Sequence, residues 1–137
     1  MEKILGKYQH YKNENIDEYF TAVGVPYFPR KMMLMTSPSL DISLDGDRWT
    51  VKNVTMMRTM IQNFVLGEEY EEKMPNGETL KSVTTKPSDN QLVTQSTVKE
   101  SGVKTSRTYD FDDDNCIITL AIGDVSGKRY FSKVKVE

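Results

Sequence analysis

The stretch "LDISLDGDRW", residues 40–49, has the pattern of a β-hairpin. Apolar residues Leu40, Ile42 and Leu44 alternate with polar ones, and a half-buried strand places such an alternating set on its core face. Asp45-Gly46 follows, a dipeptide that is typical of tight hairpin turns. This stretch therefore predicts two antiparallel strands with one buried face.

Turn signals recur at short intervals toward the C-terminus. They are Asn76-Gly77, "KPSDN" at 86–90, Ser101-Gly102, "DDDN" at 112–115 and Gly123-Asp124. They divide the chain into segments of roughly ten residues, the strand spacing of an antiparallel sandwich or barrel. A second alternating set lies at Cys116, Ile118, Leu120 and Ile122. The sequence thus predicts an all-β architecture from about residue 38 onward.

Residues 15–36 break this pattern. Apolar residues recur there at helical spacing, at Ile16, Tyr19, Phe20 and Val23. Asn15 is placed to cap this helix, with Glu18 completing a capping box, and Gly24 is placed to end it. The pattern predicts one amphipathic helix with its apolar stripe toward the core.

A second short helix is predicted at residues 30–35, "RKMMLM". Pro26 and Pro29 bracket a break before it, and Ser37-Pro38 ends it. An early strand, about residues 5–13, precedes the helical pair. We therefore expect one strand, two helices and then about nine consecutive strands.

Composition excludes several classes of function. The chain has 137 residues, enough for one domain over 1–137, and its net charge of −2 gives no basic face for nucleic acid. It has one histidine, His10, and one cysteine, Cys116, so no catalytic triad, metal site or cofactor site is expected. The acidic strings "GEEYEE" at 67–72 and "DFDDDN" at 110–115 are interpreted as solvated turns or strands. We therefore expect that this protein is not an enzyme.

The expected location is the cytosol, with the nucleus as a second compartment. The N-terminal stretch has no apolar signal core, and no apolar run approaches the roughly 18 residues of a spanning helix. A single cysteine cannot form an internal disulfide, which fits a reducing compartment. A monomer is expected.

Five segments of the chain resemble the corresponding segments of a known protein family. They are "GKY" at 6–8, "NENIDEYFTAVGV" at 13–25, "RKM" at 30–32, "LDGDRWTVK" at 44–52 and "NFVLGEEYEE" at 63–72, the last being the most specific. Together they resemble the intracellular lipid-binding proteins, which include the fatty-acid-binding and cellular retinoid-binding proteins, over the whole chain. "MRT" at 57–59 leans toward the retinoic-acid branch, while His10 and Ile16 depart from the family pattern.

The resemblance implies a ten-stranded antiparallel up-and-down β-barrel of the clam type, with a helix-turn-helix lid near the N-terminus. Ten strands are more than side chains alone can fill, so the barrel should enclose a cavity. The implied function is non-covalent binding and intracellular transport of a long-chain fatty acid or a related hydrophobic carboxylate. A retinoic-acid carrier is the alternative.

The family holds its ligand's carboxylate between two strand arginines and a tyrosine two residues after the second arginine. Arg107 and Arg129 are the candidates, and Phe131 stands at the tyrosine position. Tyr130 could take that role only if a bulge turned it inward. An ungapped match would place Thr108 instead of Arg107. Alternation favours Arg107, which shares a face with the aromatic residues Tyr109 and Phe111.

Arginine suits a buried anion site because its guanidinium stays charged and can grip a carboxylate bidentately. The alternative interpretation is that both arginines are solvated strand residues. The expected portal and cavity lining comprises Ile16, Tyr19, Phe20, Val23, Met32, Met35, Met57, Phe64, Tyr109 and Leu120. The methionines could equally be ordinary core residues. Arg30-Lys31 could contact membranes transiently during ligand transfer or serve nuclear import, although two charges fit a solvated helix face better.

Overall fold

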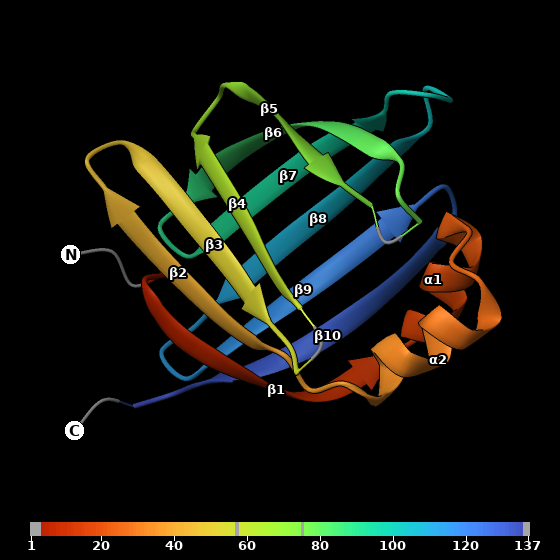
Figure 1. Cartoon of the computed structure of the whole chain (residues 1–137). Coiled ribbons are helices and arrows are strands. Elements are labelled where there is room, and N and C mark those ends of the chain that lie inside the picture. Colours follow the sequence, from red (N-terminus) through yellow and green to blue (C-terminus); the bar gives the residue numbers. More distant parts are fainter. Residues whose placement is uncertain (1–3, 57, 75, 136–137) are drawn as a thin grey trace.

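The computed structural model describes residues 4–56, 58–74 and 76–135. Ten strands and two helices lie in this described part of the chain (Figure 1). The chain order is β1 (Gly6–Glu14), α1 (Ile16–Val23), α2 (Tyr27–Met35), β2 (Ser39–Asp45), β3 (Arg48–Val54), β4 (Thr59–Val65), β5 (Glu69–Lys73), β6 (Thr79–Ser88), β7 (Gln91–Val98), β8 (Lys104–Phe111), β9 (Asn115–Ile122) and β10 (Val125–Lys133). The predicted order of one strand, two helices and nine strands is confirmed.

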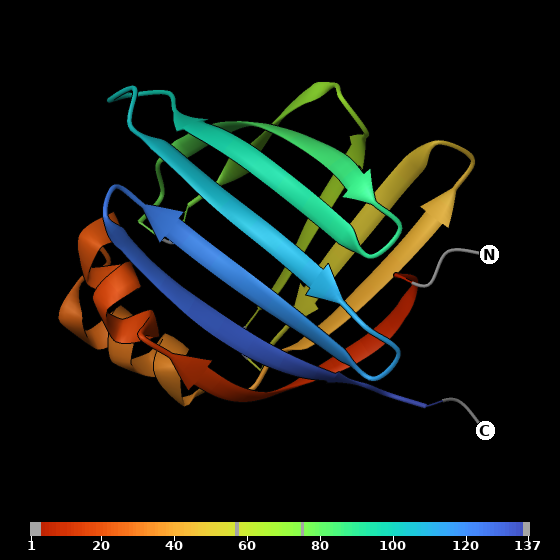
Figure 2. The ribbon, with the colours of Figure 1, turned by 180° about the vertical axis from the view of Figure 1, so that it is seen from behind.

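The strands form one antiparallel sheet in the order β4-β3-β2-β1-β10-β9-β8-β7-β6-β5. Strands that follow one another in sequence pair along β1 to β4 and along β5 to β10, and β1 also pairs with β10, so the first and last strands lie side by side (Figure 2). Strands β4 and β5 stand at the ends of the sheet and share no ladder, so the barrel is nearly closed. The rings of Phe64 and Tyr70 stack across this gap at 5.1 Å. The predicted clam fold is confirmed.

The alternating residues face the barrel interior as predicted. Leu40 and Ile42 are buried and Leu44 is partly buried. Cys116 and Ile118 are buried, and the later members of that set are partly buried. One core cluster, which includes Tyr8 and Phe111, packs inside the barrel. A second cluster joins α1 to the strands.

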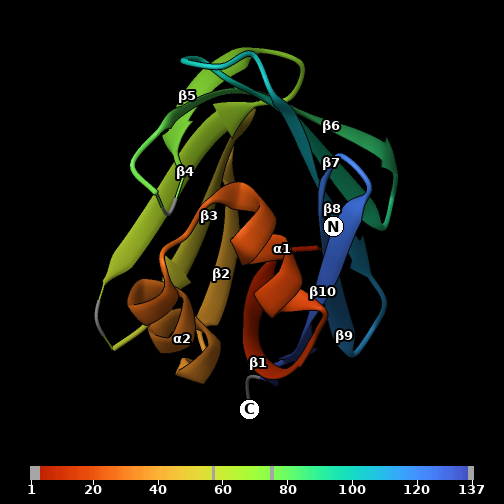
Figure 3. The ribbon, with the colours of Figure 1, turned by 90° about the vertical axis from the view of Figure 1, so that its right-hand side faces the viewer.

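Helix α1 packs its predicted stripe against the open end of the barrel (Figure 3). Ile16, Tyr19, Phe20 and Val23 are all buried. The start of α1 packs very closely against β10. A Cβ atom added at Gly127 would lie only 2.6 Å from the carbonyl oxygen of Asn15. Only glycine permits this approach. Helix α2 lies farther out and none of its residues is buried.

Two local predictions about the helices are wrong. Asn15 stands at the N-cap position as predicted, but it adopts a left-handed φ of 57° and its side chain makes no capping bond. Its side-chain amide instead donates to the carbonyl oxygen of Ser126 at 2.7 Å, so the capping box with Glu18 does not form. Helix α2 begins at Tyr27 rather than residue 30, because Pro29 lies in its first turn, where proline's missing N–H costs no helical bond.

Gly24 ends α1 as predicted, with a φ of 99° and its N–H bonded to the carbonyl of Phe20. Within the described residues, no helix has the length and apolar character needed to cross a bilayer.

Candidate ligand-binding cavity

A cavity of about 160 Å³ lies between the helices and the barrel wall. The helices contribute Tyr19, Phe20 and Met33 to its lining. The strands contribute apolar residues such as Leu40 and Ile118, together with the charged residues Glu72, Lys73, Arg107 and Arg129. Lys73 is exposed, so the other three place charge inside the barrel. The site is therefore an apolar chamber with a polar wall.

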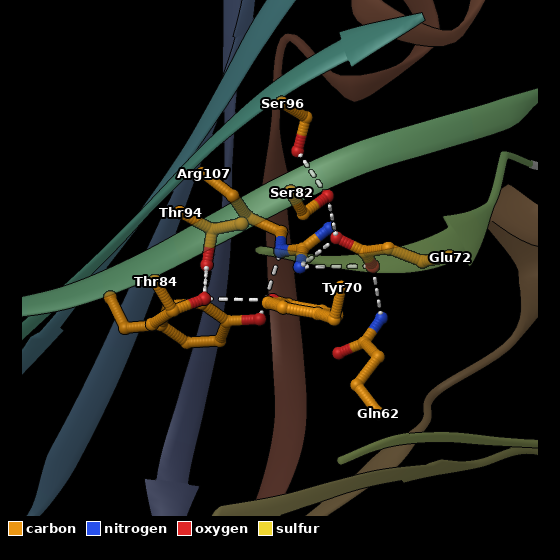
Figure 4. A network of polar contacts seen from close by, with 9 residues as sticks. Gln62, Tyr70, Glu72, Ser82, Thr84, Thr94, Ser96 and Arg107 are labelled. Carbon is orange, nitrogen blue, oxygen red and sulfur yellow. Dashed lines mark hydrogen bonds and ion pairs between the residues drawn. The ribbon is translucent and has the colours of Figure 1, made fainter. Parts of the chain in front are cut away.

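Arg107 on β8 points into the barrel and pairs with Glu72 on β5 (Figure 4). Its Nη2 donates to Glu72 Oε2 at 3.0 Å and to Oε1 at 3.1 Å, and its Nε donates to the hydroxyl of Tyr109 at 2.9 Å. The two charged side chains are 18% and 4% exposed. Burial disfavours the charge on Arg107, but Tyr109 and Glu72 outweigh it and raise the pKa of the guanidinium. The positive charge of Arg107 is thus balanced by the carboxylate of Glu72.

Side chains on two further strands bond Glu72 directly. It accepts from Gln62 Nε2 on β4 and from Ser82 Oγ on β6, each at 2.7 Å. Ser82 in turn shares a hydrogen bond of 2.7 Å with Ser96 on β7. Because β4 and β5 share no ladder, the Gln62–Glu72 bond is a side-chain bridge across the gap of the barrel. Every partner stabilises the ionised carboxylate, which a buried charge requires.

Tyrosine hydroxyls extend this polar wall. Tyr70 shares a hydrogen bond of 2.7 Å with Thr84, and Thr84 bonds Thr94 at the same distance (Figure 4). Burial raises the pKa of Tyr109 to about 12 despite the opposing effect of Arg107. Burial also raises the pKa of Tyr70. Both hydroxyls therefore stay protonated at neutral pH and act as neutral hydrogen-bonding groups.

Arg129 on β10 is the second cation of the cavity. Its Nε donates to Asn13 Oδ1 at 3.1 Å, while its Nη2 is buried and has no hydrogen-bond partner within the described part of the chain. None of the described carboxylates lies within ion-pair distance of it. Burial lowers the pKa of Arg129 to about 10, so the side chain is still charged at neutral pH. A buried, uncompensated guanidinium is unfavourable unless an anion or water occupies the site.

Phe131 follows Arg129 on the inner face and is 1% exposed. It contacts the cavity, and its ring meets that of His10 at 5.5 Å in an edge-to-face arrangement. Tyr130 lies on the outer face, where its hydroxyl donates to Glu14. The bulge in this region lies in β1, and β10 keeps a regular register with β9. The alternative that a bulge turns Tyr130 inward is therefore wrong.

The remaining predicted lining residues divide into three groups. Tyr19, Phe20, Tyr109 and Leu120 contact the cavity. Ile16, Val23 and Phe64 are buried in the surrounding core clusters. Met32 and Met35 are 45% and 86% exposed and do not line the cavity, whereas Met57 lies outside the described residues. Thr108, the alternative to Arg107, is not among the lining residues.

The sequence interpretation missed Glu72 and Met33. The acidic string around Glu72 predicts a solvated segment, yet Glu72 shares a strand face with Tyr70, and this alternation is the signal that indicates an inward position. Met33 contacts the cavity and packs against the core cluster that contains Phe20, whereas the sequence indicated Met32 and Met35 for this face.

The chain is similar to known lipid-binding proteins along almost its whole length. No family model matches it. It is 31% identical over 126 residues to the muscle fatty acid-binding protein of Schistocerca gregaria, covering 91% of this chain and 92% of that protein. It is also 31% identical over 134 residues to human cellular retinoic acid-binding protein 1, covering 96% and 98%.

Solved structures agree with these relatives. The fatty acid binding protein of Schistosoma mansoni in complex with arachidonic acid superposes with a TM-score of 0.92 at 26% identity, covering 98% of each chain. A fatty acid-binding protein from the brain of Drosophila melanogaster superposes with a TM-score of 0.86 at 32% identity, covering 92% of this chain and 95% of that one.

Proposed function

The chain belongs to the intracellular lipid-binding protein family of fatty-acid-binding and cellular retinoic-acid-binding proteins, and from this membership we propose that it carries one long-chain carboxylate inside its barrel. Members of this family are carriers rather than enzymes.

The observation that carries the proposal is the charge balance of the cavity. Glu72 compensates Arg107, while Arg129 keeps a buried Nη2 with no partner among the described residues. The chamber therefore has one uncompensated positive charge, which matches a ligand with a single negative charge. In this proposal Arg129 binds the carboxylate directly. Arg107 adds its positive electrostatic potential and its hydrogen-bond donors from the polar wall of the cavity.

The apolar walls would supply most of the binding free energy. Burying a methylene group is worth about 0.8 kcal/mol, so a chain of about a dozen gains roughly 10 kcal/mol before ordering costs. The dissociation constant is then expected between about micromolar and nanomolar. Phe131 cannot donate the hydrogen bond of the family's tyrosine, which lowers carboxylate affinity by on the order of 1 kcal/mol.

Fatty acid is the first candidate ligand and retinoic acid the second. The fatty acid-binding proteins named above support the first, and the complex of the Schistosoma protein with arachidonic acid shows that a closely similar barrel holds a long polyunsaturated acid. The likeness to cellular retinoic acid-binding protein 1 supports the second.

Transient membrane contact belongs to the same proposal. Helix α2 exposes Tyr27, Phe28, Met32 and Met35, which could enter a lipid surface during transfer. Arg30 and Lys31 are less available than the sequence implies, because both bond the carboxylate of Asp17, at 2.6 and 3.0 Å. This ion pairing speaks for a role in joining α1 to α2 and against a nuclear-import patch. A cytosolic monomer completes the proposal.

Displacement of a fluorescent fatty acid tests it. Delipidated protein is loaded with the probe and titrated with oleate, retinoic acid and oleyl alcohol. Displacement by oleate at lower concentration than by the other two supports a fatty-acid carrier, and stronger displacement by retinoic acid supports the alternative. A probe that does not bind would contradict both.

A further inference from the structure

His10 and Asn13 on β1 are joined to the proposed anchor, Arg129. Asn13 Oδ1 accepts from Arg129 Nε at 3.1 Å and lies 2.6 Å from His10 Nε2. The bulge in β1 between His10 and Lys12 brings both side chains to the inner face of the barrel, where they are largely buried. The contact between the rings of His10 and Phe131 fixes the imidazole beside the same strand as Arg129. The three residues form one unit.

The hydrogen bonds fix the proton on one nitrogen of His10. Arg129 Nε can only donate, so the Asn13 atom that it meets is the amide oxygen. An amide oxygen can only accept, so His10 Nε2 carries a proton. This holds for the neutral ring and for the imidazolium alike.

The other ring nitrogen also faces an acceptor. His10 Nδ1 lies 3.4 Å from Ser37 Oγ. That hydroxyl uses its one proton on the carbonyl oxygen of His10 at 2.6 Å and also accepts from Gln9 Nε2 at 3.1 Å. Ser37 therefore offers Nδ1 a lone pair and no proton. A second proton on His10 would turn this contact into a hydrogen bond, so the surroundings of both nitrogens suit an imidazolium.

Burial and Arg129 oppose that second proton. They lower the pKa of His10, burial being the larger effect, although the bond to Asn13 and a hydrogen bond with the backbone of Lys12 act in the other direction. Arg129, from β10, is the charged side chain that acts on the ring. The other side chains that meet the imidazole are Asn13 on β1, Ser37 before β2 and Phe131 on β10, and none of them is charged. Without ligand, His10 is therefore neutral at neutral pH.

We propose, on the basis of the carrier function above, that an anion bound at Arg129 draws a proton onto His10, so that ligand binding in this barrel is linked to proton uptake. The anion cancels the repulsion from Arg129 and adds an attraction of its own, while both acceptors around the ring stay in place. In the bound complex Arg129 contacts the ligand, while the protonated His10 lies behind it, joined through Asn13, and adds a second positive charge on the same side.

Linkage sets the sign of the pH dependence. A ligand that raises the pKa of His10 binds more tightly at every pH where the complex holds more protons than the free protein. The affinity for an ionised ligand is therefore flat above about pH 8 and rises as pH falls through the range of histidine titration. An acidic compartment or membrane surface would favour retention of the ligand.

NMR titration of His10 tests the proton linkage directly. The chain has one histidine, so in untagged protein every imidazole resonance belongs to His10. The titration is recorded for free protein, for protein with dodecanesulfonate, whose head group stays ionised throughout, and for protein with dodecanol. A higher pKa of His10 with the sulfonate than with the alcohol supports the linkage. An equal or lower value in the sulfonate complex overturns it.

Calorimetric affinities provide the second measurement. The wild-type protein should bind dodecanesulfonate about threefold or more tightly at about pH 5.5 than at about pH 8, and His10→Gln should lose this difference while keeping its affinity at the higher pH. Glutamine can still donate to Asn13, so it separates the charge from the positioning. Binding that is equally tight at both pH values in the wild type overturns the proton linkage alone. No binding at either pH overturns the carrier function with it.

Discussion

Arg107 and Glu72 form an ion pair inside the barrel, with Arg107 Nη2 3.0 Å from Glu72 Oε2. The pair joins β8 to β5, and Gln62 extends it to β4 across the gap. One carboxylate thus neutralises one of the two interior arginines and connects the two unpaired edges of the sheet. Both the stability of the barrel and the choice of anchor depend on it.

Replacing Glu72 by glutamine should destabilise the empty protein by about 3–5 kcal/mol, because Arg107 would be left as an uncompensated buried charge. The loss would be measured by urea unfolding. A fatty acid should stabilise E72Q more than the wild type, since two cations would then face its carboxylate. Glu69→Gln is the matched control, because Glu69 lies on the same strand and is 59% exposed. Unchanged stability of E72Q would contradict the structural role of the pair.

Phe131→Tyr should strengthen carboxylate binding, because it places a hydroxyl donor on the inner face beside Arg129. The expected gain is on the order of 1 kcal/mol, or about fivefold, measured by isothermal titration with oleate. Tyr130→Phe removes an outward hydroxyl and should leave the affinity unchanged. The opposite pattern, in which only Y130F changes oleate binding, would show that Tyr130 reaches the ligand.

Gly127→Ala should weaken the packing of α1 on β10. The added Cβ atom would lie 2.6 Å from the carbonyl oxygen of Asn15, so the helix start would have to move. We expect a loss of about 1–3 kcal/mol in the free energy of unfolding and faster ligand dissociation in stopped-flow measurements. Ser126→Ala is the control at an exposed neighbouring position. Equal stability of G127A and S126A would show that the close contact is not a constraint.

Asp17→Asn should loosen α2 from α1, because it removes the carboxylate that holds Lys31 and Arg30. These bonds lower the pKa of Asp17 below its usual 3.8, so their stabilisation is present above that value and is lost as pH falls through the lower pKa of the folded state. Amide hydrogen exchange in α2 should be faster in D17N than in the wild type at neutral pH. The difference should disappear once the pH has fallen below that lower pKa.

Glu18→Gln, on the exposed face of the same helix, is the control for Asp17. A difference in exchange between D17N and the wild type that persists unchanged in acid would show that the ion pairs do not join the helices.

Much of the fold could be predicted from local patterns. Strand alternation in 40–44 and 116–122 and the turn signal Asp45-Gly46 depend on short-range chemistry, and the structure confirms them. The same alternation predicts that Arg107 and Arg129 face the barrel interior, and both line the cavity. The alternation of apolar and polar residues identifies the buried face of a strand from local sequence alone, whatever packs against that face.

The errors arose where a distant partner decides. The side chain of Asn15 bonds Ser126, 111 residues away, and gives its own helix no side-chain cap. Glu72 belongs to an acidic string, and its partners Arg107, Gln62 and Ser82 all lie on other strands. Met33 rather than Met32 contacts the cavity, where it packs against the core cluster that contains Phe20. No local pattern contains these contacts.

The affinity of Arg129→Leu for oleate and for oleyl alcohol is the most direct test of the anion anchor. Removing a buried guanidinium whose charge no carboxylate among the described residues balances should not lower stability, so the variant should fold and bind both ligands. We predict about a 10- to 100-fold loss for oleate, from the loss of charge-assisted hydrogen bonds, and little change for the alcohol. The exposed Arg48→Leu should change neither affinity. Equal losses for oleate and the alcohol, or no loss for either, would contradict an anion anchor at Arg129.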